Sequence, residues 1–228
     1  METVVITGAN RGIGLGLVKV FLANKARVVA ACRHPEKAQE LQKLAKNSDL
    51  EILPLDVANE ASITGFIASL GDQPIDILIN NAGTLGGERQ SASDMDFDAW
   101  AQAFVVNTIA PFRLTVGLRA NLKRSSRPRV ISVSSQMGSL AGEGAGYYAY
   151  RSSKAALNKV MRGLATDLEP DGVLVCPIHP GWVKTDMGGA NAAITVTQSA
   201  EGIFRLIDTL TAAQSGHFLT WEGEELPW

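Results

Sequence analysis

The chain has 228 residues, a length that suits one α/β domain and leaves little room for a second independently folded one. Hydrophobic residues make up 46% and charged residues 19%, a composition that favours a packed core over disorder. The net charge of −2 gives no broad positive field that would attract nucleic acid or an anionic membrane. Neither is expected as a partner, and any phosphate site must be local.

Short runs rich in β-branched residues recur along the chain and predict strands. They are Thr3–Thr7, Arg27–Cys32, Ile52–Leu55, Ile75–Asn80, Arg129–Ser134, Leu174–Ile178 and His217–Trp221. The runs are nearly all apolar and do not alternate with polar residues. This pattern is typical of parallel strands that helices cover on both faces.

Longer segments with apolar residues at helical spacing lie between these runs. They are Gly14–Asn24, Glu36–Lys46, Glu60–Leu70, Phe97–Leu122, Ala149–Leu168 and Thr197–Leu210. The alternation predicts a single α/β domain over residues 1–228, a Rossmann fold with a doubly wound, mainly parallel sheet of about seven strands and helices on both faces. Ligands of such sheets bind beyond the carboxyl ends of the strands, so Gly83–Ser93, Ser135–Gly146 and Gly181–Ile194 should line one cleft.

Two features bear on the cellular setting. Cys32 and Cys176 are the only cysteines, and each lies in an apolar run, which predicts two buried thiols and no disulfide framework or metal cluster. The apolar segment from Thr3 follows no basic leader, and no apolar run reaches the roughly 18 residues of a transmembrane helix. We expect a cytoplasmic protein with no metal and no membrane partner.

A glycine-rich turn, Thr7–Gly14, follows the first predicted strand and leads directly into a helix. Glycine permits a tight turn and close backbone approach, and the free N–H groups at a helix start attract a pyrophosphate. The spacing is G-x-x-x-G-x-G, which differs from the G-x-G-x-x-G of the standard dinucleotide fingerprint. A purely structural turn is the alternative.

The end of the second strand favours NADPH or NADP over NAD. Enzymes that use NAD usually place an acidic residue there to bond the ribose 2′-OH, and this chain has Cys32. Arg33 and, in the glycine turn, Arg11 could clamp a 2′-phosphate through charge-assisted hydrogen bonds. The alternative is that both arginines are solvated surface charges.

All three tyrosines lie close together, and only Tyr150 has a lysine one helical turn later, at Lys154. On a helix this spacing places both side chains on one face. We expect the ammonium to lower the phenol pKa from about 10 toward 7, which takes about 4 kcal/mol. Tyr147 has Arg151 at the same spacing and is a possible decoy; with Trp182 and Met187 it is also a candidate wall of the substrate pocket, ordinary core packing being the alternative.

Together these motifs resemble the short-chain dehydrogenase/reductase family over essentially the whole chain. The matching landmarks are Thr7–Gly14, Asp56, Asn80–Gly83, Asn107, Ser134–Gly138, Tyr150–Lys154 and Pro180–Thr185. Residues 147–154 and the ending Phe218–Trp228 resemble the C-factor and sniffer-type carbonyl reductase branch.

The resemblance implies roles for four catalytic residues. Tyr150 would be the general acid/base, and Lys154 would tune it and bind the nicotinamide ribose. Ser135, which precedes a glycine by three residues, would hydrogen-bond the substrate oxygen, while Ser134 faces the other way on its strand. Asn107 would hold a water on a proton relay, or could be a satisfied polar residue within a helix.

The resemblance also implies the residues that would bind the dinucleotide. Asp56 would bond the adenine, or could be a helix cap. The full predicted set, besides Tyr150 and Lys154, is Gly8, Asn10, Arg11, Gly12, Ile13, Gly14, Arg33, Asp56, Val57, Asn81, Ala82, Gly83, Pro180, Gly181, Val183 and Thr185.

The predicted function is reduction of an aldehyde or ketone with NADPH, or alcohol oxidation in reverse. The alternative is a signalling protein of the C-factor type that binds the dinucleotide with little or no turnover. A nucleotide-sugar epimerase is disfavoured, because those relatives carry an additional substrate domain. Phe97–Leu122 and Ala149–Leu168 have more apolar positions than one buried stripe needs, so we expect a homodimer or homotetramer.

Overall fold

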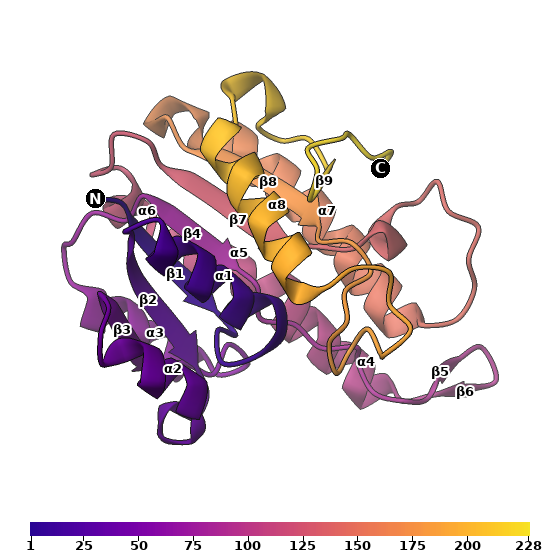
Figure 1. The fold of residues 1–228 in the computed structure, drawn as a ribbon. Coiled ribbons are helices and arrows are strands. Elements are labelled where there is room, and N and C mark those ends of the chain that lie inside the picture. The colour runs from indigo at the N-terminus through magenta and orange to yellow at the C-terminus, as the bar shows by residue number, and fades with distance from the viewer.

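The computed structural model describes residues 1–228 and builds them around one seven-stranded sheet (Figure 1). Its strands are β1 (Thr3–Thr7), β2 (Arg27–Cys32), β3 (Leu50–Pro54), β4 (Ile77–Asn80), β7 (Arg129–Val133), β8 (Leu174–His179) and β9 (Leu219–Thr220). Their spatial order is β3-β2-β1-β4-β7-β8-β9, and every neighbouring pair is parallel. A separate antiparallel hairpin, β5 (Gln90–Ser91) and β6 (Asp94–Met95), follows β4.

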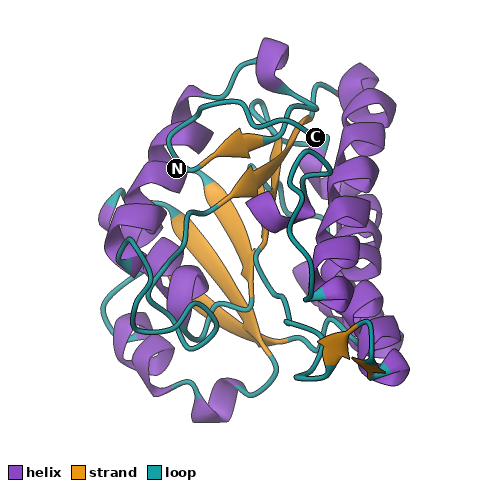
Figure 2. Ribbon diagram, turned by 90° about the vertical axis from the view of Figure 1, so that its right-hand side faces the viewer, coloured by secondary structure: helices purple, strands orange, loops and turns teal.

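Helices cover both faces of the sheet (Figure 2). They are α1 (Gly12–Ala23), α2 (Gln39–Ala45), α3 (Glu60–Leu70), α4 (Phe97–Phe104), α5 (Ala110–Gly117), α6 (Arg119–Leu122), α7 (Tyr148–Leu168) and α8 (Val196–Thr209). Helices α1, α2 and α8 pack into one apolar layer, and α3, α5 and α7 pack into the other. The predicted doubly wound Rossmann fold is confirmed, and no helix has the length and apolar character needed to cross a membrane.

The pleat of the strands explains why the predicted strand sequences do not alternate. Successive side chains of a strand point to opposite faces, so Val4 and Ile6 enter the layer under α1, whereas Val5 enters the layer under α3. Both layers are buried, and each strand position therefore needs an apolar side chain. The two cysteines are free and buried in this core, as predicted.

The prediction of one continuous helix over Phe97–Leu122 is wrong. A π-helical turn, Val105–Ile109, separates α4 from α5, and α6 begins after a break at Leu118. Pro111 lies in the first turn of α5, directly after the π turn. Because proline has no N–H, it cannot make the hydrogen bond that would continue a regular α-helix from α4. The π turn, which has one residue more than an α-helical turn, accommodates this break. Gly117, a poor helix former, precedes the second break.

The remaining differences from the predicted elements concern their ends. The segment predicted as helix from Glu36 begins with a 3-10 turn, Pro35–Lys37, and α2 follows only at Gln39. The last strand has two residues where five were predicted. The hairpin β5–β6 was not predicted, and other boundaries move by one or two residues, as is usual for helix and strand ends.

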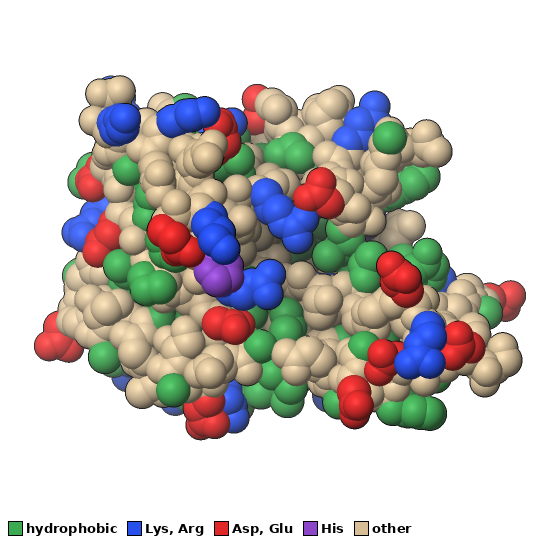
Figure 3. Space-filling view, turned by 90° about the horizontal axis from the view of Figure 1, so that it is seen from below, with side chains coloured by type: hydrophobic (Ala, Val, Ile, Leu, Met, Phe, Trp, Pro, Cys, Tyr) green, Lys and Arg blue, Asp and Glu red, His purple; other side chains and the backbone are tan.

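The parallel sheet brings the three candidate site loops together. All seven strands point the same way, and the loops Gly83–Ser93, Ser135–Gly146 and Gly181–Ile194 leave the adjacent strands β4, β7 and β8. Figure 3 views the molecule from this side and shows a hollow with Lys and Arg side chains beside it. The predicted cleft therefore lies at the carboxyl edge of the sheet.

Candidate active site

The turn between β1 and α1 leaves no space for side chains at two of its glycines. Gly8 has φ +64, and a Cβ there would lie 2.9 Å from the Ala82 Cα. A Cβ on Gly14 would lie 2.4 Å from the carbonyl oxygen of Gly8. Helix α1 begins at Gly12, and its first residues receive no side-chain cap from Arg11, so their N–H groups remain available at the cleft. This arrangement fits a pyrophosphate.

Thr7 and Asn81 hold the glycine turn in place. The Thr7 hydroxyl accepts hydrogen bonds from the backbone N–H groups of Asn81 and Ala82, both at 3.0 Å. In return the Asn81 amide donates to the carbonyl oxygens of Thr7 at 2.9 Å and Gly8 at 3.2 Å. These bonds tie the ends of β1 and β4 together, so Asn81, Ala82 and Gly83 lie directly beside the turn, where the cofactor-binding prediction needs them.

The two arginines predicted to bind a 2′-phosphate differ in their surroundings. Arg33 is exposed just after β2 and takes part in none of the ion pairs of the chain. Arg11 is also exposed, but it forms an ion pair with Asp186 of the loop after β8. Arg33 is therefore free to bind an anion, whereas Arg11 must first leave a carboxylate.

Asp56 lies at the end of the third strand but caps no helix. Asn59 caps α3 by accepting a hydrogen bond from the Ser62 N–H at 2.9 Å. One carboxylate oxygen of Asp56 accepts from the Ala58 N–H at 3.0 Å, a local turn that fixes the side chain at the carboxyl edge. Val57 follows it, half-buried.

Tyr150 and Lys154 lie on the first two turns of α7 and are both buried, with 9% and 4% of their surface exposed. The Lys154 ammonium lies 5.9 Å from the centre of the Tyr150 ring and donates a hydrogen bond to the Val133 carbonyl oxygen at 2.6 Å. Ser135 follows β7, and its hydroxyl accepts from the Met137 N–H at 3.1 Å. Ser134 points the other way, as predicted, and its hydroxyl donates to the Asn158 side-chain oxygen at 2.5 Å.

Burial dominates the protonation of this pair. It raises the pKa of the Tyr150 phenol, and hydrogen bonding with Ser135 offsets part of that rise. It also lowers the pKa of Lys154 to about 8. The prediction that Lys154 brings the phenol pKa toward 7 is wrong here, because burial raises that pKa and the ammonium, 5.9 Å from the ring centre, does not offset the rise. The phenol stays neutral at pH 7, which is the form that donates a proton.

Asn107 lies in the π-helical turn with its side chain committed to protein partners. Its amide donates to the Thr84 carbonyl oxygen at 2.8 Å and to the Ser153 hydroxyl at 3.0 Å. Its own carbonyl oxygen accepts from the Thr84 N–H at 2.9 Å and keeps a second lone pair. A Cβ on Gly83 would lie 3.3 Å from that oxygen and 3.7 Å from the Lys154 ammonium, so Gly83 lies beside both groups.

The loop after β8 closes over the glycine turn. Gly181 has φ +86, and a Cβ there would lie 2.4 Å from the Ile194 side chain. Val183 pairs with Ile194, and the Thr185 methyl group approaches Gly12 closely enough that a Cβ there would lie 3.4 Å away. The loop starts at Pro180, whose carbonyl oxygen accepts from Ser199 of α8 at 2.6 Å. In the glycine turn itself, Asn10 is exposed and Ile13 packs against the core.

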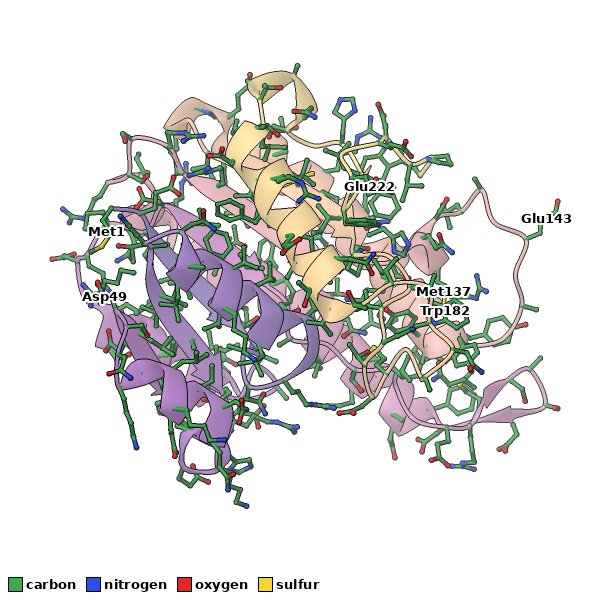
Figure 4. All side chains as sticks on the ribbon, viewed as in Figure 1. Met1, Asp49, Met137, Glu143, Trp182 and Glu222 are labelled. Atoms are coloured by element: carbon green, nitrogen blue, oxygen red, sulfur yellow. The ribbon has the colours of Figure 1, made fainter.

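Three large side chains at the cleft are not core residues. Tyr147, Trp182 and Met187 are 53%, 54% and 44% exposed, which excludes ordinary core packing and suits walls of an open substrate pocket. Figure 4 labels Trp182 and Met137, which come from the loops after β8 and β7. Tyr147, Trp182 and Met187 therefore remain candidate walls of the substrate pocket.

Sequence reasoning missed Gln90, which positions the start of α7. This buried side chain accepts a hydrogen bond from the Tyr150 N–H at 3.1 Å. Its amide donates to the carbonyl oxygens of Leu85 and Gly87, both at 2.7 Å. A glutamine in a polar loop gives no sequence signal, because its partner lies sixty residues away.

Comparisons with known proteins agree with this geometry. The family model of the short chain dehydrogenases matches residues 2–194. C-signal of Myxococcus xanthus is 42% identical over 164 residues, which cover 72% of this chain and 98% of that protein. The carbonyl reductase Sniffer of D. melanogaster has a TM-score of 0.94 and 35% identity, with both chains fully covered. The NADPH-bound carbonyl reductase from chicken fatty liver has a TM-score of 0.94 and 37% identity, covering 100% of this chain and 99% of that one.

The sequence resembled the C-factor and sniffer-type carbonyl reductase branch, and C-signal and the carbonyl reductase Sniffer are among these matches. The family model spans most of the chain, from the glycine turn to the loop after β8. The chain therefore belongs to the short-chain dehydrogenase/reductase family.

Proposed function

We propose that this protein is a carbonyl reductase that uses NADPH to reduce a small aldehyde or ketone, with cofactor and substrate bound in the single domain of residues 1–228. The observation that carries the proposal is the grouping of Ser135, Tyr150 and Lys154 at the carboxyl edge, next to a glycine turn with no room for side chains. The two buried free thiols suit a protein of the reducing cytoplasm.

The cofactor-binding residues follow the carboxyl edge of the sheet. The start of α1 and the glycine turn would hold the pyrophosphate, and Arg33 with Arg11 would hold the 2′-phosphate. Asp56 would bond the adenine, and Asn81–Gly83 would lie along the adenosine ribose. Pro180–Thr185 would contact the nicotinamide. When bound, NADPH would supply a hydride to the carbonyl carbon of the substrate.

The side chains of this protein manage the oxygen and the proton. The Ser135 hydroxyl donates a hydrogen bond to the carbonyl oxygen and stabilises the negative charge that develops there. Tyr150 transfers its phenolic proton to the same oxygen, which completes the alcohol. The ammonium of Lys154 stabilises the phenolate left behind until it takes a proton from water. The free lone pair of Asn107 would hold that water.

The first test removes the proton donor. Tyr150→Phe keeps the ring but lacks the hydroxyl, so kcat/KM for carbonyl reduction should fall by about 10²–10⁴. Tyr147→Phe is the matched control, because Tyr147 lies one turn from Arg151 as Tyr150 lies one turn from Lys154. Its kcat/KM should stay near that of the wild type, since Tyr147 is not the proposed proton donor. NADPH binding, followed by cofactor fluorescence, should persist in both. Full turnover by Tyr150→Phe would remove Tyr150 from the mechanism.

A second candidate function is signalling or regulation through dinucleotide binding, without appreciable turnover. The 42% identity with C-signal favours it. The presence of Ser135, Tyr150 and Lys154 in one buried group favours the enzyme. Oxidation of NADPH by the purified protein, measured with a panel of aldehydes and ketones, separates the two. Binding of NADPH without oxidation on any panel member would support the signalling function.

A further inference from the structure

A pocket of about 420 Å³ lies beside the candidate active site. Its lining comes from four parts of the chain: the turn after β7 with Gln136 and Met137, the loop through Gly144, Arg151 of α7, and the C-terminal residues Leu226 and Pro227. Gln136 directly follows Ser135 in the sequence. The pocket and the carbonyl-binding position therefore share one short segment of backbone.

Hydrogen bonds between distant segments build the wall of this pocket. The Ser139 hydroxyl donates to the Pro227 carbonyl oxygen at 2.8 Å. The Ala141 N–H donates to the carbonyl oxygen of Trp228 at 3.1 Å. Trp228 is fixed in turn, because its ring stacks on Phe218 and lies 5.0 Å from the Arg162 guanidinium. The end of the chain thus holds the loop in position.

Arg151 is the one charged residue that lines the pocket, and it has no partner in the chain. Its Nε–H is buried without an acceptor, and none of the ion pairs includes it. Its backbone directly follows that of Tyr150 on α7, while its side chain lines the pocket. An arginine is charged at any physiological pH, which leaves an uncompensated positive charge in the pocket.

A structural arginine of the same protein looks different. The buried Arg129 donates to the carbonyl oxygens of Arg127 and Ile207, both at 3.1 Å, and pairs with the Glu2 carboxylate. The acid of the pocket loop does not take this role for Arg151, because Glu143 points away from the body of the molecule (Figure 4).

Glycine lets the loop lie directly on the guanidinium of Arg151. A Cβ on Gly144 would be 2.3 Å from one of its terminal nitrogens. The guanidinium is therefore held by packing and not by an acceptor. A buried donor without an acceptor destabilises the protein, and an anion that accepts from the Nε–H would remove that cost.

We propose that this pocket is a subsite for an anionic group of the substrate, a carboxylate, at the end remote from the carbonyl, and that Arg151 determines this specificity. A carboxylate accepts two hydrogen bonds from one guanidinium, which makes the pairing directional as well as strong. That the other end of the substrate is an aldehyde or ketone rests on the proposed carbonyl reduction. Binding of a carboxylate in this pocket does not depend on that reaction.

The kinetic test compares acids with their own neutral esters. The substrates are the semialdehydes of succinic, adipic and suberic acid, each beside its methyl ester, so that the distance from aldehyde to carboxylate varies. For the acid of matching length, kcat/KM should exceed that of its ester by roughly tenfold or more, the range expected for hydrogen bonds to charged groups. Arg151→Met keeps the aliphatic packing and should abolish this preference without changing reduction of the esters. Arg151→Lys should restore part of it.

Arg205→Met is the charge-matched control, because Arg205 is exposed on α8 and lines neither the pocket nor the active site. It should keep the preference for the acid. No preference for any acid in the wild type, or a preference that survives in Arg151→Met, would overturn the proposal.

A binding measurement separates this proposal from the proposed function. Adipate and suberate contain no aldehyde, and calorimetric titration measures their affinity without turnover. Affinity that is lost in Arg151→Met and kept in Arg205→Met supports the subsite even if no aldehyde is reduced. Equal affinities of wild type and Arg151→Met for both dianions would reject the subsite even if the esters are good substrates.

Discussion

Lys154 carries a charge that the folded protein disfavours. Burial lowers its pKa to about 8, well below the value of an exposed lysine, while the unfolded chain keeps the ordinary value. Below pH 8 the charged ammonium destabilises the fold by up to about 3 kcal/mol, and this penalty disappears as the pH rises through about 8 to 10.5. The role proposed for Lys154 therefore opposes the stability of the fold.

This penalty gives a testable pH dependence. Without cofactor, wild type should gain stability relative to Lys154→Met as the pH rises from about 7 to about 10, because the uncharged variant has no such group to titrate. Urea unfolding of both proteins at the two pH values measures the difference. The variant also lacks the hydrogen bond to Val133, an effect of nearly constant size. A difference independent of pH would mean that Lys154 titrates alike in the folded and unfolded chains.

Cofactor preference is a second prediction at this scale. NADPH should bind more tightly than NADH, and Arg33→Ala should weaken NADPH binding by roughly tenfold to a hundredfold with little effect on NADH. Asp186→Asn should do the opposite for NADPH, because it releases Arg11 from its ion pair. Fluorescence titration at constant salt measures all these affinities. Equal dissociation constants of the wild type for NADPH and NADH would contradict the assignment of both arginines.

At the scale of the element, features that depend on neighbouring residues were predicted well from the sequence. Features that depend on contacts between distant residues were not. The glycine turn and the Tyr150–Lys154 pair follow from short motifs, and the strands follow from apolar runs. The raised pKa of Tyr150 depends on burial by the folded chain as a whole. Gln90, in the hairpin strand β5, accepts a hydrogen bond from Tyr150 of the distant helix α7, and no sequence periodicity reveals that contact.

The segment Phe97–Leu122 shows the same limit within one element. The spacing of its apolar residues predicts a helix correctly for most of the segment. The same spacing does not reveal the π turn within it. That turn also carries the buried bonds from Asn107 to Thr84 and Ser153, residues far away in the sequence. The role predicted for Asn107, holding a water, therefore belongs to a residue of the π turn, which the apolar spacing does not reveal.

At the scale of the whole molecule, an apolar surface predicts association. Three apolar side chains of the π turn and α5 are exposed: Ile109 (41%), Phe112 (43%) and Val116 (45%). Their spacings of three and four residues place them on one face of this helical segment. We expect a homodimer or homotetramer that buries this face. Light scattering at micromolar concentration should return a multiple of 24.2 kDa for the wild type, and Phe112→Lys should lower the mass.

Thr64→Lys is a matched control, because it adds the same charge at an exposed position of α3 and should leave the mass unchanged. A wild type that stays at 24.2 kDa would contradict the expected assembly.

The order of the sheet also determines how the chain can fold during its synthesis. β2 pairs with β1, β3 with β2, and β4 with β1, after which β7, β8 and β9 extend the other side one by one. Each strand from β2 onward thus leaves the ribosome after a strand with which it can pair at once. Between β4 and β7 a fully buried central strand remains an open edge for almost fifty residues of translation. This interval is when the nascent protein is most exposed to pairing with another chain.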